Sequence, residues 1–89
     1  MFTVYVLYSK NFDKIYIGYT SNLIQRIWNH NFGMDKSFTK NFRPCLVIHC
    51  EYFETKSEAM RREKELKTFQ GRKFIRETQI VLMTNLNFI

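Results

Sequence analysis

The fold is decided by two runs of sequence, Phe2-Thr-Val-Tyr-Val-Leu-Tyr8 and Ile15-Tyr-Ile-Gly-Tyr19. Both runs are rich in β-branched and aromatic residues, which favour strands. The segment between them, Ser9-Lys-Asn-Phe-Asp-Lys14, carries several turn-forming residues. Together the three segments predict an antiparallel β-hairpin.

The length of the loop sets the register of this hairpin. The expected pairs are Tyr8 with Ile15, Leu7 with Tyr16, and Tyr5 with Gly18. Because side chains alternate between the two faces of a strand, Tyr5 and Tyr16 are expected to project from the same face. Gly18 weakens a strand, so its presence suggests close approach by another backbone, a bulge or a ligand.

One more strand and three helices are expected after the hairpin, which gives an α+β chain. In order, they are a helix over 22–31, a basic loop over 32–44, a strand over 45–53, a helix from a capping box at 55–58 to about residue 69, and a helix over 72–83. Gly71 is expected to end the middle helix in a left-handed conformation. On the first helix, Ile27 and Trp28 are expected to anchor the packing.

The whole chain has 89 residues, which is enough for one compact domain over residues 1–89. No apolar run reaches the roughly 18–20 residues needed to cross a bilayer, and no secretory signal is visible, so a cytoplasmic location is expected. Cys45 and Cys50 are an odd number of residues apart, which predicts opposite strand faces and free thiols. His30 and His49 are isolated, so a structural zinc site is not expected.

The charge of the chain indicates a polyanionic partner. Fourteen Lys and Arg against eight Asp and Glu give a formal net charge of +6 and a pI near 9.6. Nucleic acid is the natural partner for such a surface. The simpler alternative is that the charge only keeps the protein soluble.

Glu63 departs from the apolar pattern of its predicted helix. Ala59, Met60, Leu66 and Phe69 form the expected apolar stripe, and Glu63 lies among them at helical spacing. A buried carboxylate needs an Arg, a Lys or a metal ion beside it. The alternatives are an ion pair with Arg26 or Arg62, and a position at the edge of the stripe that reaches solvent.

Arg26 and His30 share one face of the first helix because they are four residues apart. A fixed cation and a titratable imidazole on one face are suited to a single substrate. Many such pairs are only a solvated helix surface. Strand tyrosines such as Tyr5 and Tyr16 are likewise usually core residues.

In their order and spacing, these residues resemble the GIY-YIG nuclease family, and most closely its minimal, single-domain bacterial members. The resemblance covers about residues 2–76. It rests on Thr3-Val-Tyr5, Tyr16-Ile-Gly18, Arg26, His30 and the downstream Glu63. The family fold is a small three-stranded antiparallel sheet flanked by helices, about three of them here, in agreement with the elements expected above.

The resemblance implies a metal-dependent endonuclease that hydrolyses DNA phosphodiester bonds with one Mg²⁺ or Mn²⁺ ion. By this analogy Glu63 ligates the metal, and Tyr5 is the general base or orients water, with His30 able to take up its proton. Tyr16 orients water or phosphate, and Arg26 stabilises the developing charge. An unperturbed tyrosine is a poor base, so positive charge from Arg26, the metal and Lys14 is expected to lower its pKa.

The chain departs from the family pattern in two places. Thr3 and Val4 replace the Gly and Ile of the first motif, where only the tyrosine takes part in chemistry. Many members also use an Asn near the C-terminus, and only Asn85 and Asn87 are candidates here.

The remaining cations fit a surface that contacts phosphates without reading bases. The expected nucleic-acid-binding residues are Lys14, Lys36, Lys40, Arg43, Arg62 and Lys67. No separate DNA-binding domain is expected, which favours structure-selective or nonspecific cutting of duplex, branched or single-stranded DNA. The rival hypothesis is a module that keeps the fold and the basic surface but binds nucleic acid without cutting it.

Overall fold

The computed structural model of the chain describes residues 1–33 and 44–80. Its elements are β1 (Phe2–Ser9), β2 (Lys14–Thr20), α1 (Leu23–Phe32), β3 (Leu46–Phe53), α2 (Lys56–Lys67), α3 (Phe69–Phe74) and the π-helical segment η2 (Ile75–Ile80). The α+β class and the order of elements agree with the sequence expectation. The end of the predicted last helix and most of the basic loop lie outside the described residues.

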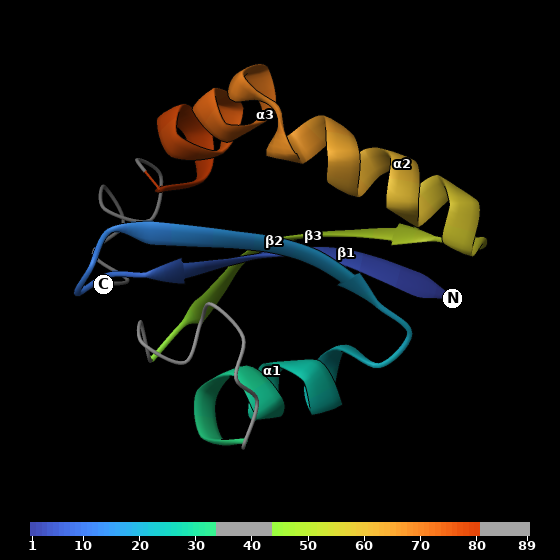
Figure 1. Ribbon diagram of the computed structural model, residues 1–89, viewed down its shortest axis with the longest axis horizontal. Helices are drawn as coiled ribbons and strands as arrows, with labels where there is room; N and C mark the ends of the chain where they lie inside the picture. Colours follow the sequence, from blue (N-terminus) through green and yellow to red (C-terminus); the bar gives the residue numbers. More distant parts are fainter. Residues whose placement is uncertain (34–43, 81–89) are drawn as a thin grey trace.

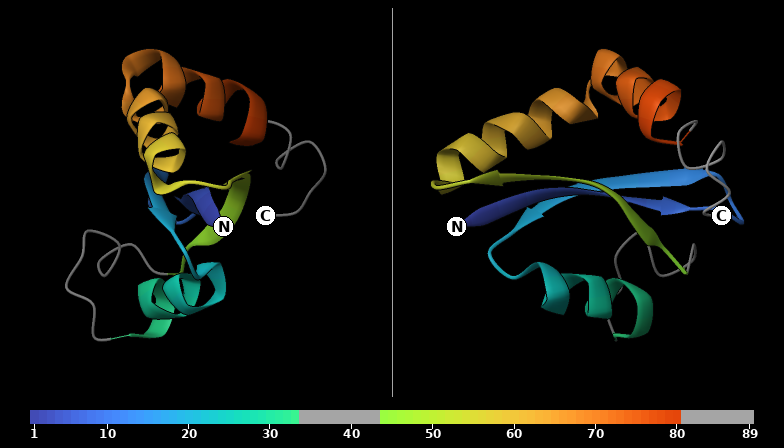
Figure 2. Two further views of the ribbon diagram at one scale, coloured as in Figure 1. Left: turned by 90° about the vertical axis from the view of Figure 1, so that its right-hand side faces the viewer. Right: turned by 180° about the vertical axis from the view of Figure 1, so that it is seen from behind.

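The three strands form one antiparallel sheet with β1 in the centre and β2 and β3 at its edges. Helix α1 covers one face of this sheet, and α2 and α3 cover the other (Figure 1). The views in Figure 2 show the same three layers from the side and from behind. No helix among the described residues has the length and apolar character to cross a membrane.

The register of the hairpin is the one predicted from its loop. Tyr5 lies opposite Gly18, Leu7 opposite Tyr16, and Tyr8 opposite Ile15. One additional pair forms at the loop end, so the turn shortens to residues 10–13. Asp13 closes it with a φ of 52°, a left-handed conformation that aspartate tolerates.

The core consists of two clusters, one on each face of the sheet. Between the sheet and the C-terminal helices lie Val4, Val6, Tyr8, Ile15, Ile17, Ala59, Leu66 and Ile75. The smaller cluster on the α1 face is formed by Tyr5, Leu7 and Cys45, with Tyr16, Leu23, Val47 and Cys50 packed against it. Because β1 contributes alternate residues to both clusters, it joins the two layers.

The two cysteines lie on the same face of the sheet, which corrects the sequence expectation. A β-bulge shifts the β1–β3 register, so that Val6 pairs with His49 but Leu7 pairs with Val47. The extra residue reverses the inside–outside alternation along β3. Cys45 and Cys50 therefore both belong to the α1-face cluster, and they remain free thiols as predicted.

The apolar stripe predicted on α2 is only half correct. Ala59 and Leu66 are fully buried, but Met60 is 37% and Phe69 is 78% exposed. Ala59, Glu63 and Leu66 recur at helical spacing, so the glutamate does lie on the sheet-facing side of α2. Phe69 was misplaced because α2 ends before it.

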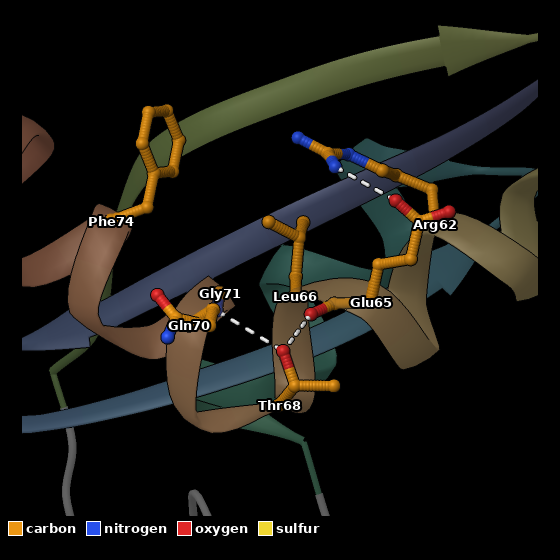
Figure 3. A pocket seen from close by; sticks show the side chains of 7 residues that line it. All are labelled: Arg62, Glu65, Leu66, Thr68, Gln70, Gly71 and Phe74. Carbon is orange, nitrogen blue, oxygen red and sulfur yellow. Dashed lines mark hydrogen bonds and ion pairs between the residues drawn. The ribbon is translucent and has the colours of Figure 1, made fainter.

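Gly71 does not end a helix in the left-handed region, because no glycine of the described residues has a positive φ. The break occurs instead at Thr68, whose hydroxyl donates to the Glu65 carbonyl and accepts from the Gly71 N–H (Figure 3). A Cβ on Gly71 would overlap the backbone of Glu65 and lie 2.5 Å from Leu66 Cα. The missing side chain therefore lets α3 pack tightly on the end of α2.

Of the two residues expected to anchor α1, Ile27 is half-buried, whereas Trp28 faces outward. Ile24, Trp28 and Phe32 are 82%, 59% and 69% exposed, so Trp28 does not anchor the helix. Leu23 packs against the α1-face cluster and His30 is fully buried. The most apolar stripe thus faces outward because the inner face carries the polar residues of the site.

Candidate active site

Gly18 creates the space in which the hydroxyl of Tyr5 lies. Tyr5 extends from the central strand toward its pairing partner on the edge strand β2, and its ring is buried. A Cβ at position 18 would lie 2.6 Å from Tyr5 Oη and 2.8 Å from its Cζ. The close approach expected at Gly18 is therefore that of a tyrosine side chain.

Helix α1 brings Arg26 and His30 to this hydroxyl. Arg26 Nε donates to Tyr5 Oη at 3.4 Å, and His30 Nε2 lies 3.1 Å from the same oxygen. The helix begins at Asn22, whose side chain accepts from the Gln25 N–H. The predicted spacing of four residues thus places one cation and one imidazole around a single phenol.

Tyr16 completes an aromatic group on the same face. Its ring centroid lies 6.4 Å from that of Tyr5 and 4.8 Å from that of His30. This agrees with the predicted common face of the two tyrosines. His30 is fully buried and contacts the Tyr5 hydroxyl.

Glu63 approaches the same pocket from α2 on the opposite side of the sheet, beside the edge strand. The pocket is about 370 Å³ in volume, and its walls are formed by Tyr5, Tyr16, Gly18, Tyr19, Thr20, Arg26 and Glu63. Glu63 Oε1 accepts from Lys67 Nζ at 3.3 Å, and its side chain is 17% exposed. Its ion-pair partner is therefore Lys67, whereas Arg26 and Arg62 were the expected candidates.

Burial controls the ionisation of Tyr5. Loss of solvent raises the pKa of its phenol, the hydrogen bond from Arg26 lowers it, and nearby Tyr16 and Glu63 raise it further. The net direction of the pKa is upward: Arg26 lowers it as expected, but burial outweighs that effect, and Lys14 is not among the groups that shift it. Because Tyr5 keeps its proton at neutral pH and already accepts from Arg26, we assign its O–H as the donor to His30 Nε2.

A carboxylate at the wall of an open pocket suits a hard divalent cation. Mg²⁺ is commonly held by one or two carboxylates, with water and substrate phosphate oxygens filling its remaining positions. Glu63 meets this requirement, and Lys67 is its ion-pair partner. No group of three or more His, Cys, Asp or Glu side chains that could hold a metal occurs among the described residues.

The other predicted contact residues are distributed unevenly. Lys67 lies beside the pocket, whereas Lys14 lies at the far end of β2 and forms no part of its wall. Arg62 points toward β3, where its Nε donates to Glu51 at 2.9 Å. The remaining candidates, Lys36, Lys40, Arg43, Asn85 and Asn87, lie outside the described residues.

Two wall residues, Tyr19 and Thr20, were not singled out by the sequence. Thr20 Oγ1 donates to the Asn22 carbonyl at 3.3 Å and accepts from its N–H at 3.1 Å, which fixes the turn into α1. The only feature of the sequence that could have identified them as wall residues is their position directly after the Tyr16-Ile-Gly18 motif. Neither residue type is unusual at the end of a strand.

The fold and the paired-tyrosine pocket define a GIY-YIG catalytic domain. The model of that family matches residues 1–74, and the chain belongs to the family. GIY-YIG domains are nuclease domains, so nuclease activity on nucleic acid is the general activity indicated. The expected resemblance to minimal, single-domain bacterial members is confirmed by the relatives found.

These relatives carry the name UPF0213. The chain is 47% identical over 66 residues to UPF0213 protein SH2523 of Staphylococcus haemolyticus, covering 74% of this chain and 79% of that protein. It is 40% identical over 70 residues to SSP2268 of Staphylococcus saprophyticus, covering 79% and 84%. The solution NMR structure of UPF0213 protein BH0048 from Bacillus halodurans matches with a TM-score of 0.52 and 29% identity, over 89% of this chain and 87% of that one.

Proposed function

We propose that this protein is a divalent-metal-dependent endonuclease that hydrolyses DNA phosphodiester bonds, using one Mg²⁺ or Mn²⁺ ion. The observation that carries the proposal is the Tyr5 hydroxyl, which contacts both Arg26 and His30 at the wall of a pocket that Glu63 closes from the other side. A nucleophile-activating group, a fixed cation and a metal-binding carboxylate are the parts that phosphodiester hydrolysis requires.

Each residue has a distinct role in this proposal. Arg26 binds the scissile phosphate and offsets the charge that develops on it. Tyr5 orients the attacking water and accepts its proton, while the proton of the Tyr5 hydroxyl passes to His30, to which it is already hydrogen-bonded. Tyr16 orients water or phosphate from the same face. A cation held by Glu63 would supply Lewis-acid stabilisation of the phosphate charge.

The alternative function is a module that binds nucleic acid without cutting it. Two observations favour it: Lys67 already satisfies Glu63, and burial raises the pKa of Tyr5. Under the nuclease proposal, a cation held by Glu63 would take the place of Lys67, and its positive charge would lower the pKa of the Tyr5 phenol. The binding module requires only the basic surface.

The test is a cleavage assay on duplex, branched and single-stranded DNA with Mg²⁺, Mn²⁺ or EDTA. We expect metal-dependent cutting that Glu63→Gln and Tyr5→Phe each reduce by about 10²–10⁴-fold. Glu65→Gln is the matched control, because Glu65 lies on the same helix but pairs with Arg62 away from the pocket. Binding without cutting under every condition would establish the alternative, and equal loss in the Glu65 variant would refute the role of Glu63.

A further inference from the structure

Three neighbouring hollows lie between the edge strand β2 and the C-terminal helices. The catalytic pocket shares Tyr16 with a second hollow, whose other wall residues are Ile15, Ile17, Lys67 and Arg72. That hollow shares Arg72 with a third on the outer side of α3, whose other wall residues are Phe69, Lys73, Arg76 and Glu77. The three hollows therefore form a row from the catalytic pocket to α3, in which each hollow shares one wall residue with the next.

The two hollows beyond the catalytic pocket are lined by more cations than anions. Arg72 is the central cation, because it lines two of the three hollows. Its Nε donates to the uncharged Lys67 carbonyl at 3.1 Å. The bond holds the guanidinium in place without neutralising it. Arg76 differs, because Asp13 pairs with it at 3.0 Å. An oriented, unneutralised guanidinium suits a phosphate group.

Phe69 adds an exposed aromatic surface to the same path. Its side chain is 78% exposed and lies directly after the corner between α2 and α3. Thr68 fixes that corner through its bonds to Glu65 and Gly71 (Figure 3). Aromatic rings beside cations are the means by which proteins bind single strands, since an unpaired base can stack on the ring.

Other cations of α2 line none of these hollows. Arg62 is held by Glu51 and Glu65 on the β3 side of the helix. Arg61 and Lys64 are exposed but form no part of the three hollows. Charge alone therefore does not define the path, and the same helix supplies matched control positions.

We propose that one unpaired strand of the nucleic-acid substrate runs from the catalytic pocket along β2 and over the α2–α3 corner. Arg72 binds a backbone phosphate, and a base stacks on Phe69. This proposal rests on the proposed function, because it requires a nucleic-acid substrate in the pocket. It goes further by assigning the substrate form, a single-stranded segment, and the side of the domain along which that segment lies.

The test measures equilibrium binding of a labelled single-stranded oligonucleotide and of a duplex of the same length, in EDTA and over a range of salt concentrations. Arg72→Ala should weaken single-strand binding roughly five- to tenfold and lower the slope of log K against log salt by about 0.7. Arg72→Lys should restore most of that slope. Lys64→Ala removes an exposed cation of α2 that lines none of the three hollows, and it should leave the slope unchanged.

Phe69→Leu tests the stacking contact independently of charge. We expect roughly tenfold weaker single-strand binding, an unchanged salt slope and a smaller effect on the duplex. Equal effects of Arg72→Ala and Lys64→Ala, or equal weakening of duplex and single strand by Phe69→Leu, would overturn the proposed path. Absence of nucleic-acid binding by the wild type would overturn it together with the proposed function.

The two proposals fail in different ways. Binding that responds to Arg72 and Phe69, without cleavage in any metal, would refute the nuclease and keep the path. Cleavage that requires Glu63 but proceeds normally in the Arg72 and Phe69 variants, with unchanged binding, would keep the nuclease and refute the path.

Discussion

Gly18 is the residue on which the geometry of the pocket depends most directly. It lies opposite Tyr5 in the hairpin, and the phenol occupies the volume that any side chain at this position would take. The ring of Tyr5 is buried and cannot move aside freely. A single missing methyl group therefore positions the hydroxyl between Arg26 and His30.

We predict that Gly18→Ala displaces the Tyr5 hydroxyl and reduces cleavage by at least about 10²-fold, since small misplacements of a reacting group have effects of this size. Overpacking should also lower the free energy of unfolding by about 1–3 kcal/mol. Single-turnover cleavage and urea denaturation measure the two effects. In a Tyr5→Phe background, Gly18→Ala should lower the free energy of unfolding by less, because one of the two Tyr5 atoms that the added Cβ would overlap is the hydroxyl oxygen. An unchanged cost would show that the hydroxyl is not the source of the clash.

Among the elements, the corner between α2 and α3 has the tightest backbone packing at a glycine. Gly71 lies within α3 and faces the last turn of α2, where Leu66 Cα would be 2.5 Å from an added Cβ. The corner also determines where Phe69 and Arg72 lie relative to β2. Its geometry therefore concerns both stability and the proposed substrate path.

We predict that Gly71→Ala destabilises the protein by about 1–3 kcal/mol or more, because the neighbouring atoms are backbone and cannot rotate away. Urea denaturation with global fitting measures the change. Gln70→Ala, at an exposed position of the same helix, should change stability by no more than about 0.5 kcal/mol. A Gly71→Ala variant as stable as the wild type would mean that α3 packs less closely on α2 than described.

Strand β3 and helix α2 are joined by an ion-pair network. Glu51 accepts from Arg62 at 2.9 Å and lies 2.7 Å from His49 Nε2. Burial alone would raise the pKa of Glu51, but its hydrogen bonds with Arg62 and His49 outweigh burial and hold the pKa below its usual value. The ionised carboxylate is therefore favoured by folding.

A depressed folded pKa has a defined consequence for acid stability. The contribution of Glu51 is fully present above its unfolded pKa of about 4.5 and is lost as the pH falls through the lower folded value. We predict that Glu51→Gln costs about 1–2 kcal/mol near pH 7 and that this difference narrows below about pH 4.5. Urea denaturation at several pH values measures it, with Glu54→Gln as an exposed control. A difference that stays constant with pH would contradict the role of the Glu51 carboxylate.

At the scale of the whole molecule, one strand connects both layers of the core. Val4 and Val6 of β1 face α2, whereas Tyr5 and Leu7 face α1. Both layers pack on β1, so loss of packing on one face exposes apolar side chains of the strand that supports the other face. The described part of the chain should therefore unfold as one unit.

We predict a single cooperative transition in urea. Far-UV circular dichroism, which the helices dominate, and near-UV circular dichroism from the aromatic residues should give coincident curves. Leu7→Ala, on the α1 face, should lower the midpoint of both curves equally. Separate midpoints for the two signals would show that the layers unfold independently.

The sequence by itself determined the hairpin, its register, the α+β class and the family to which the chain belongs. Local information is sufficient there, because loop length and a two-residue period fix which hairpin residues pair and which share a face. The common helix face of Arg26 and His30 could be predicted in the same way, from their spacing of four residues. The common face of Tyr5 and Tyr16 followed from the same rules.

Only the tertiary structure decided which residues from separate elements meet. Nothing in the sequence indicates the bulge that puts Cys45 and Cys50 on one face, or that Arg62 of α2 pairs with Glu51 of β3. The sequence also misplaced one of the two expected anchors of α1, since Trp28 faces outward. Periodicity describes the neighbours of a residue within its own element, whereas burial and ion pairing depend on side chains that other elements bring to it.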